Sequence, residues 1–481
     1  MSDLWPKIQM ELAFSPEPQG EALKPGGEGT ESLAAKRQTE SSVVVEELME
    51  EVVERENLKE ALRRVKANKG SPGVDGMTVQ QLPGYLQEHW PILREQLLSG
   101  TYQPQPVKRV EIPKPDGGMR NLGIPTVLDR WIQQAVMQVL QKRWDRTFSE
   151  HSYGFRPSRS AHQAIVQAQQ YVGEGLRWVV DLDLEKFFDR VHHDKLMGQV
   201  AKRVADKRVL KLIRAFLKAG VMENGLVSPV DEGTPQGGPL SPLLSNLVLD
   251  ELDRELERRG HRFVRYADDC NIYVRSERAG RRVMESTTRF ITLRLKLKVN
   301  QAKSAVARPE ERKFLGFSFT SDAEPRRRIA PKAMARFKQR VRELTRRTQG
   351  VSLQQMLRPL GEYLVGWRAY FGFCQTPGRL EGLDSWIRRR LRSVLWTQWK
   401  RHGRRVEELR RRGVGREWAV KTACSAHGPW RLSHNPIVCQ ALPNAYFDAL
   451  GLPRLATWLL LNPPNRRVRF RTHGGVAGVG G

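Results

Sequence analysis

The feature that most constrains the fold is a pair of adjacent aspartates between two short runs of β-prone residues. Residues 262–266 and 270–274 flank Ala267, Asp268 and Asp269. Because Asp favours turns, this pattern predicts a β-hairpin with two carboxylates at its tip. Neighbouring ionised carboxylates raise each other's pKa unless a cation lies between them. Turns that contain two Asp are common, however, so the pair alone does not establish a functional site.

A second acidic segment gives the pair a chemical partner. Residues 177–184 form an apolar run with Asp181 and Asp183, which alternation places on one face of an extended strand. If this strand pairs with the hairpin, one of its carboxylates joins the other two. Three converging carboxylates suit two Mg²⁺ ions, which favour oxygen ligands and can promote an in-line phosphoryl displacement. The residues alone leave both Asp181 and Asp183 open as the third ligand.

Two loops carry further candidate residues. Residues 232–242 are rich in Gly and Pro and lead into the apolar run 243–249. Their small side chains would let backbone lie close to a planar ligand, although a plain loop before a helix has the same composition. Residues 111–120 indicate a hairpin turn carrying Lys114 and Arg120. These two could contact phosphates, while basic residues at turns are more often only solvated.

The charge balance predicts a polyanionic partner. Lys and Arg total 81 against 53 Asp and Glu, a net charge of +28. No apolar run approaches the roughly 20 residues that span a bilayer, and the first residues do not resemble a secretion signal. The four cysteines lie far apart without a CxxC spacing, which favours neither a zinc site nor a disulfide framework. We therefore expect a cytoplasmic protein with no membrane association.

The positive charge is concentrated in the second half of the chain. Residues 1–57 contain 5 Lys or Arg against 13 Asp or Glu, whereas residues 326–421 contain 26 against 7. The basic segment combines arginine triplets with apolar, aromatic stripes at helical spacing, so one helix face could pack while another contacts phosphates. A solvated face is the alternative, but so large a surplus of like charge favours a bound polyanion.

Taken in order, these segments closely resemble a bacterial group II intron-encoded protein, a reverse transcriptase that is also an RNA-splicing maturase. The resemblance extends from about residue 56 to about residue 452. Residues 266–269 match the catalytic box and residues 234–242 the nucleotide-site loop. Residues 152–162 look like a block characteristic of these enzymes, and residues 314–317 look like the primer grip.

The resemblance implies site residues. Asp183, Asp268 and Asp269 would be the catalytic residues and the ligands of two Mg²⁺ ions. Asp183 is preferred to Asp181 because the family places an aromatic gate five residues beyond the catalytic Asp, where Phe188 stands. The implied nucleotide-binding set comprises Lys114, Arg120, Lys186, Phe187, Phe188, Gln236 and Lys303.

The resemblance also implies an α/β (α+β) polymerase fold with the right-hand arrangement of fingers, palm and thumb. Fingers and palm with a mixed or antiparallel sheet would precede an α-helical thumb and a helical, basic C-terminal extension. The expected domains are a disordered acidic leader (1–42), an N-terminal helical extension with the start of the fingers (43–100), fingers and palm (101–322), thumb or maturase domain (323–400), DNA-binding extension (401–460) and a flexible Gly-rich tail (461–481).

The implied function is an RNA-directed DNA polymerase that also assists splicing and mobility of a group II intron. Its expected partners are group II intron RNA, an RNA template with a DNA primer, target DNA and dNTPs, with monomer and homodimer both open. Nothing after residue 452 resembles the endonuclease of many members, which indicates the compact class. Alternatives are a non-polymerising splicing scaffold and a retron, CRISPR-associated or host-repair reverse transcriptase. The expected nucleic-acid contacts are Arg156, Arg159, Arg388, Arg389, Arg390, Lys400 and Arg401.

Overall fold

The computed structural model describes residues 47–113, 119–223, 226–228, 233 and 237–456. The chain divides into two compact units. The described parts of the first unit lie within residues 47–148 and 186–251, and those of the second within 149–185 and 252–456. No helix in these ranges combines the length and apolarity needed to cross a membrane.

The first unit is a set of helices with one small sheet. The sheet has the order β2-β1-β4-β5, with β1 antiparallel to β2 and parallel to β4. The predicted hairpin around residues 111–120 is confirmed, since Pro113 pairs with Met119. The described elements are α2 (Leu48–Val52), α3 (Arg55–Asn68), α4 (Leu82–Ser99), β1 (Val107–Pro113), β2 (Met119–Ile124), α5 (Val127–Trp144), η1 (Asp145–Thr147), η2 (Phe187–Asp189), α7 (His193–Ala201), α8 (Lys207–Lys218), β4 (Val221–Glu223), β5 (Leu226–Ser228) and the start of α9 (Ser241–Arg258).

Helix α5 shows how the first unit is held together. The Thr126 side chain caps its first turn by accepting a hydrogen bond from the Asp129 backbone amide. Apolar side chains at helical spacing, among them Ile132, Val136 and Leu140, are buried. Burial of a side chain of this size contributes about 1.5–3 kcal/mol, so this helix is a central support of the unit.

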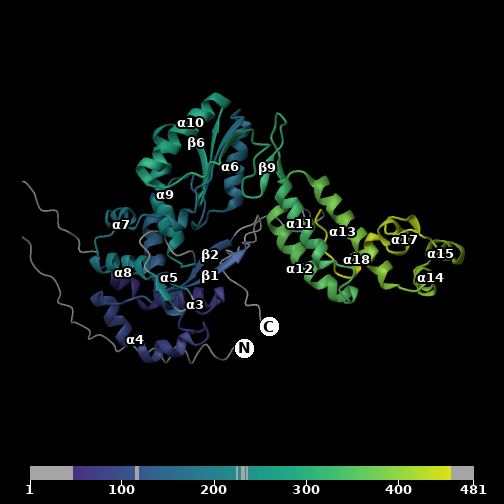
Figure 1. Cartoon of the computed structure of the whole chain (residues 1–481), viewed down its shortest axis with the longest axis horizontal. Helices are drawn as coiled ribbons and strands as arrows, with labels where there is room; N and C mark the ends of the chain where they lie inside the picture. The colour runs from purple at the N-terminus through teal and green to yellow at the C-terminus, as the bar shows by residue number, and fades with distance from the viewer. Residues whose placement is uncertain (1–46, 114–118, 224–225, 229–232, 234–236, 457–481) are drawn as a thin grey trace, which may run out of the picture. The chain divides into compact units, whose positions relative to one another are not determined.

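The second unit begins with an antiparallel sheet in the order β6-β7-β3-β8. Helices α6 and α10 lie on either side of this sheet (Figure 1). A separate two-stranded sheet joins β9 and β10. The elements of this part are α6 (Ala161–Gly173), β3 (Trp178–Leu182), β6 (Arg262–Tyr266), β7 (Asp269–Val274), α10 (Glu277–Phe290), the short π-helical turn η3 (Ile291–Leu295), β8 (Ala305–Ala307), β9 (Phe317–Phe319) and β10 (Arg327–Ile329).

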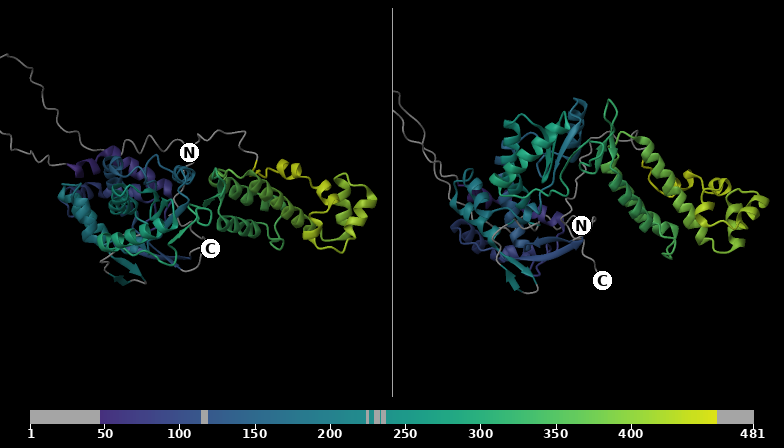
Figure 2. Two further views of the ribbon diagram at one scale, coloured as in Figure 1. Left: turned by 90° about the horizontal axis from the view of Figure 1, so that it is seen from above. Right: turned by 45° about the horizontal axis from the view of Figure 1, so that its top comes forward.

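The rest of the second unit is helical, shown in green to yellow in Figures 1 and 2. One apolar core runs from the four-stranded sheet through α11 and α12 to α18, and includes Val179, Phe337, Leu364 and Phe447. The predicted fold class is confirmed: sheets with helices, followed by an all-helical C-terminal region. Its helices are α11 (Pro331–Leu344), α12 (Leu353–Phe371), α13 (Pro377–Gln398), α14 (His402–Arg411), α15 (Arg416–Ala423), α16 (Pro429–Leu432), α17 (Pro436–Ala441) and α18 (Asn444–Ala449).

Candidate active site

The register of the four-stranded sheet brings the predicted acids to one edge. Strand β3 pairs with β7 so that Asp181 is opposite Asn271 and Leu182 is opposite Cys270. Continuing that register by one residue places Asp183, directly after β3, opposite Asp269, the first residue of β7. The prediction that the acidic strand pairs with the hairpin is therefore confirmed.

The hairpin between β6 and β7 has the tight turn that the sequence predicts. Tyr266 pairs with Asp269, which leaves Ala267 and Asp268 as the two residues of the turn. Ala267 has a φ of 56°, in the left-handed region that residues with a Cβ atom rarely occupy. The two adjacent carboxylates thus leave the sheet from a sharply bent backbone.

Several aspartate carboxylates lie near one another at this edge, and their negative charges repel one another. Desolvation by the surrounding protein, and then the charges of Asp268, Asp181 and Asp183, raise the pKa of Asp269 to about 7. Lys313 acts in the opposite direction and lowers it. A cation bound among these side chains would relieve the repulsion.

The structure gives different surroundings to Asp181, which is in β3, and Asp183, which directly follows it. Arg312 donates from both Nε (2.8 Å) and Nη2 (2.6 Å) to Oδ2 of Asp181. Burial raises the pKa of Asp181, and the hydrogen bond from Arg312 opposes that rise. The Asp183 side chain is 32% exposed, and its Oδ2 lies 3.7 Å from Nζ of Lys303. Asp181 is thus engaged by a guanidinium, while Asp183 is more open to a ligand.

Arg312 also organises the segment that carries Lys303. Its Nη2 donates to the Lys303 backbone oxygen at 2.6 Å, so one guanidinium contacts both this segment and Asp181. Sequence reasoning missed Arg312, which is 131 residues from Asp181. Its position close to the 314–317 segment was the only available signal.

The other residues of the implied nucleotide-binding set belong to the first unit. Lys186 has a φ of 50° and precedes η2, in which the Phe187 side chain is buried and that of Phe188 half-buried. The two rings are 5.3 Å apart between centroids. Arg120 lies in β2 opposite Ile112. Lys114 and Gln236 lie outside the described residues.

Two of the arginines predicted to contact nucleic acid, Arg156 and Arg388, are buried, which corrects those two assignments. Nη1 of Arg156 donates to the backbone oxygens of Ser149 (2.5 Å) and Ser152 (3.0 Å). Its guanidinium therefore supports the backbone of its own segment. Arg159 is half-buried and forms an ion pair with Glu150.

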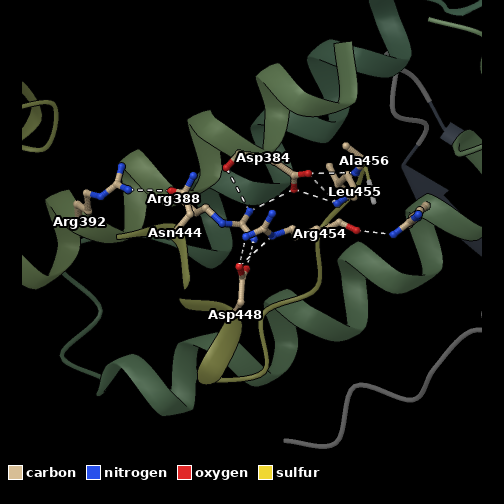
Figure 3. A network of polar contacts seen from close by, with 9 residues as sticks. Asp384, Arg388, Arg392, Asn444, Asp448, Arg454, Leu455 and Ala456 are labelled. Atoms are coloured by element: carbon tan, nitrogen blue, oxygen red, sulfur yellow. Dashed lines mark hydrogen bonds and ion pairs between the residues drawn. The ribbon is translucent and has the colours of Figure 1, made fainter. Parts of the chain in front are cut away.

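Arg388 is the second correction (Figure 3). Its side chain is 1% exposed and contacts the carboxylates of Asp384 (3.2 Å) and Asp448 (2.5 Å). Asp384 in turn accepts hydrogen bonds from the backbone amides of Leu455 and Ala456. This network fastens the chain beyond α18 to helix α13, so Arg388 has a structural role and does not face a phosphate.

The remaining predicted contacts differ in their accessibility. The Arg389 guanidinium lies over the Trp430 ring, 4.2 Å from its centroid. Arg390 donates from Nε to the Thr345 hydroxyl at 2.8 Å. Lys400 and Arg401 are exposed. Of the seven predicted residues, these last two fit a nucleic-acid surface best.

Comparison with known proteins agrees with this geometry. The family of reverse transcriptases (RNA-dependent DNA polymerases) matches residues 112–319, and the group II intron maturase-specific domain matches residues 334–413. The chain thus combines a region similar to reverse transcriptases with a region similar to group II intron maturases, and its relatives include group II intron-encoded proteins. These matches confirm the predicted resemblance and the reverse transcriptase class of the matched region.

Individual relatives match parts of the chain. Protein YkfC of Escherichia coli (strain K12) is 42% identical over 233 residues, which are 47% of this chain and 61% of that protein. Group II intron-encoded protein LtrA of Lactococcus lactis subsp. cremoris is 40% identical over 195 residues, which are 40% of this chain and 32% of that protein. The chain thus matches less than two thirds of either relative's length.

One similar solved structure has a lower sequence identity to this chain than these relatives have. A chain of the partial Cas6-RT-Cas1--Cas2 complex is 24% identical with a TM-score of 0.34, covering 51% of this chain and 42% of that chain. The family assignment therefore depends on the two matched families and on the sequence relatives.

Proposed function

We propose that this protein is an RNA-directed DNA polymerase that transfers nucleotides from dNTPs to a primer 3′-OH. The observation that carries the proposal is the convergence of Asp183, Asp268 and Asp269 at one edge of a sheet within the matched reverse transcriptase region. The crowding that raises the pKa of Asp269 supports a cation-binding role for this edge.

The donor atoms at this edge fit divalent metal ions, which reverse transcriptases generally use. In the described part of the chain, no group of three or more His, Cys, Asp or Glu side chains forms a ready-made metal cage. Mg²⁺ is commonly bound by one or two carboxylates together with water and substrate phosphates, so a complete cage is not required. Asp183, Asp268 and Asp269 would hold two Mg²⁺ ions. When bound, these ions would supply Lewis-acid stabilisation of the attacking and leaving oxygens.

The other side chains of the site would bind and orient substrate. Lys303, whose ammonium group lies beside Asp183, would offer positive charge to the departing phosphate. By resemblance to the family, Phe188 would exclude a nucleotide 2′-OH, and Gln236 with the backbone near Lys186 and Phe187 would line the dNTP site. Lys114 and Arg120 would contact the triphosphate.

Primer extension on an RNA template with dNTPs and Mg²⁺ tests the proposal. The wild type is compared with Asp268→Ala/Asp269→Ala. The control is Asp322→Ala/Glu324→Ala, which removes the same charge from an exposed turn. We expect template-length cDNA from the wild type and the control only. Extension by the Asp268→Ala/Asp269→Ala variant would refute the catalytic assignment.

A second role, binding and assisting the splicing of a group II intron RNA, is supported by the maturase-specific match at residues 334–413. The positive surplus in residues 326–421 supplies the electrostatic attraction, and exposed Lys400 and Arg401 offer phosphate contacts. A protein that binds intron RNA with strong salt dependence but extends no primer would instead be a splicing scaffold. Intron mobility and binding of target DNA follow as proposals from the same family.

A further inference from the structure

A fully buried arginine lies directly behind the acidic turn. Arg265 is in β6, and neither its side chain nor that of Asp253 in α9 is exposed (0% for each). Nε of Arg265 donates to Oδ1 of Asp253 at 2.7 Å, and Nη2 donates to Oδ2 at 2.6 Å. Replacing a buried ion pair with apolar side chains is often neutral or stabilising, so stability alone does not account for this one.

The remaining hydrogen bonds of the Arg265 guanidinium connect it to the turn. Nη1 donates to the backbone oxygen of Ala267 at 2.9 Å, and Nη2 donates to the Ser152 hydroxyl at 2.8 Å. The backbone of Arg265 also exchanges hydrogen bonds with His151 and Tyr153, each of 2.9 Å. One residue thus links helix α9, the segment around Ser152 and the turn that carries the catalytic acids.

The turn that Arg265 contacts is in an unfavourable conformation. Ala267 has a φ of 56°, a region in which the Cβ atom crowds the following carbonyl. Such a conformation persists only where the surroundings fix it. The backbone of Gly154 also approaches the turn, so closely that a Cβ atom there would lie 2.3 Å from the Ala267 nitrogen. Ala267 is therefore contacted at its nitrogen by the Gly154 backbone and at its oxygen by the Arg265 guanidinium.

We propose that Arg265, anchored by Asp253, is a positioning residue of the polymerase site. By holding the Ala267 carbonyl it fixes the turn, and the turn directs Asp268 and Asp269 toward the edge where Asp183 lies. The inference rests on the proposed function, since it assigns a purpose to the same acidic site. Groups that orient the ligands of a metal commonly change metal affinity or activity by about 10- to 100-fold when they are removed.

The test must separate positioning from stability. Arg265→Met alone would leave the Asp253 carboxylate buried and unpaired, and it could unfold the protein. The double variant Arg265→Met/Asp253→Leu removes both charges and replaces them with apolar side chains of similar size. It also removes the donor to Ala267. The matched control is Arg203→Met/Asp250→Leu, which removes another ion pair on helix α9 (2.8 Å).

Three quantities are measured on the full chain: the melting temperature, the affinity for Mn²⁺ followed by electron paramagnetic resonance, and the Mg²⁺ concentration that gives half-maximal primer extension. For the double variant we expect a melting temperature near that of the wild type. We also expect Mn²⁺ affinity to fall by about 10- to 100-fold, with a matching rise in the Mg²⁺ requirement. The control should leave both metal readouts unchanged.

Wild-type Mn²⁺ affinity in a folded double variant would overturn the proposal, because the pair would then be merely structural. If the double variant failed to fold, Arg265→Lys would provide the comparison. A lysine keeps the charge beside Asp253 but cannot reproduce the planar set of donors that also reaches Ala267. If the wild type itself incorporated no dNTP, the proposed function would fail, and the Mn²⁺ comparison would still decide the role of Arg265.

Discussion

Replacing Asp269 with Asn should make the metal-free protein more stable at neutral and alkaline pH. The folded-state pKa of Asp269 is raised from 3.8 to about 7 by desolvation and by Asp268, Asp181 and Asp183. A carboxyl group with a raised pKa stabilises the fold below its unfolded pKa, and this contribution is lost as the pH rises toward 7. Asn has a similar shape and carries no charge, so it avoids that loss.

The magnitude follows from the pKa. A rise of this size corresponds to about 4 kcal/mol at a pH above 7, because each pKa unit is worth about 1.4 kcal/mol. Protein surrounds the Asp269 carboxyl group on several sides, but the residue stands at the end of its strand and remains accessible to solvent, so screening reduces the effect to roughly 1–2 kcal/mol. For a protein of 481 residues the entropy of unfolding is about 1 kcal/mol/K, so the melting temperature should rise by about 1–2 °C at pH 8.

The assay is thermal unfolding of the full chain in a metal chelator at pH 4.5 and pH 8. Asp269→Asn should show its gain at pH 8 and little gain at pH 4.5. Asp322→Asn is the control of opposite sign, because a hydrogen bond from Arg326 lowers the pKa of Asp322. Equal gains at both pH values, or none at pH 8, would refute the electrostatic account of the site.

Four further results are expected. Addition of Mg²⁺ should raise the wild-type melting temperature more at pH 8 than at pH 5, since protons compete for the same carboxylates; equal shifts would contradict this. Asp183→Asn should abolish primer extension, whereas Asp181→Asn should reduce it less, because Asp181 is engaged by a guanidinium; similar losses would show that both acids bind metal. Arg388→Ala should destabilise the protein by about 3–5 kcal/mol in denaturant unfolding. Lys400→Ala/Arg401→Ala should leave stability unchanged and weaken RNA binding, with a smaller salt dependence. If Arg388→Ala instead weakened RNA binding without a loss of stability, Arg388 would belong to the binding surface.

The acidic edge could be predicted because its determinants are local in sequence. Alternation places Asp181 and Asp183 on one face, and an Ala-Asp-Asp turn between two β-prone runs predicts the hairpin. The choice between the two acids could not be made from physical reasoning on the residues, since both occupy the same face. In the structure the difference comes from Arg312, and nothing in the local pattern of β3 identifies so distant a partner.

In the basic segment, residues 326–421, the net positive charge is evident from the sequence, but it does not reveal the different roles of the individual arginines. Arg388, Arg389 and Arg390 are identical in sequence terms, yet one is buried in an ion-pair network, one lies over a Trp ring and one donates to a threonine. Asp384, four residues before Arg388, was a local signal of its ion pair but not of its burial. The second partner, Asp448, lies 60 residues beyond Arg388 and gave none.

Burial also determines which positive charges of this segment contribute to RNA binding. A buried arginine that is paired with two carboxylates does not release counterions when RNA binds, so it adds nothing to the salt dependence of binding. Only exposed side chains such as Lys400 and Arg401 contribute. Residues 326–421 carry a surplus of 19 positive charges, from 26 Lys or Arg against 7 Asp or Glu. Removing Arg388 should therefore change RNA binding only to the extent that it unfolds the helices that present the exposed charges.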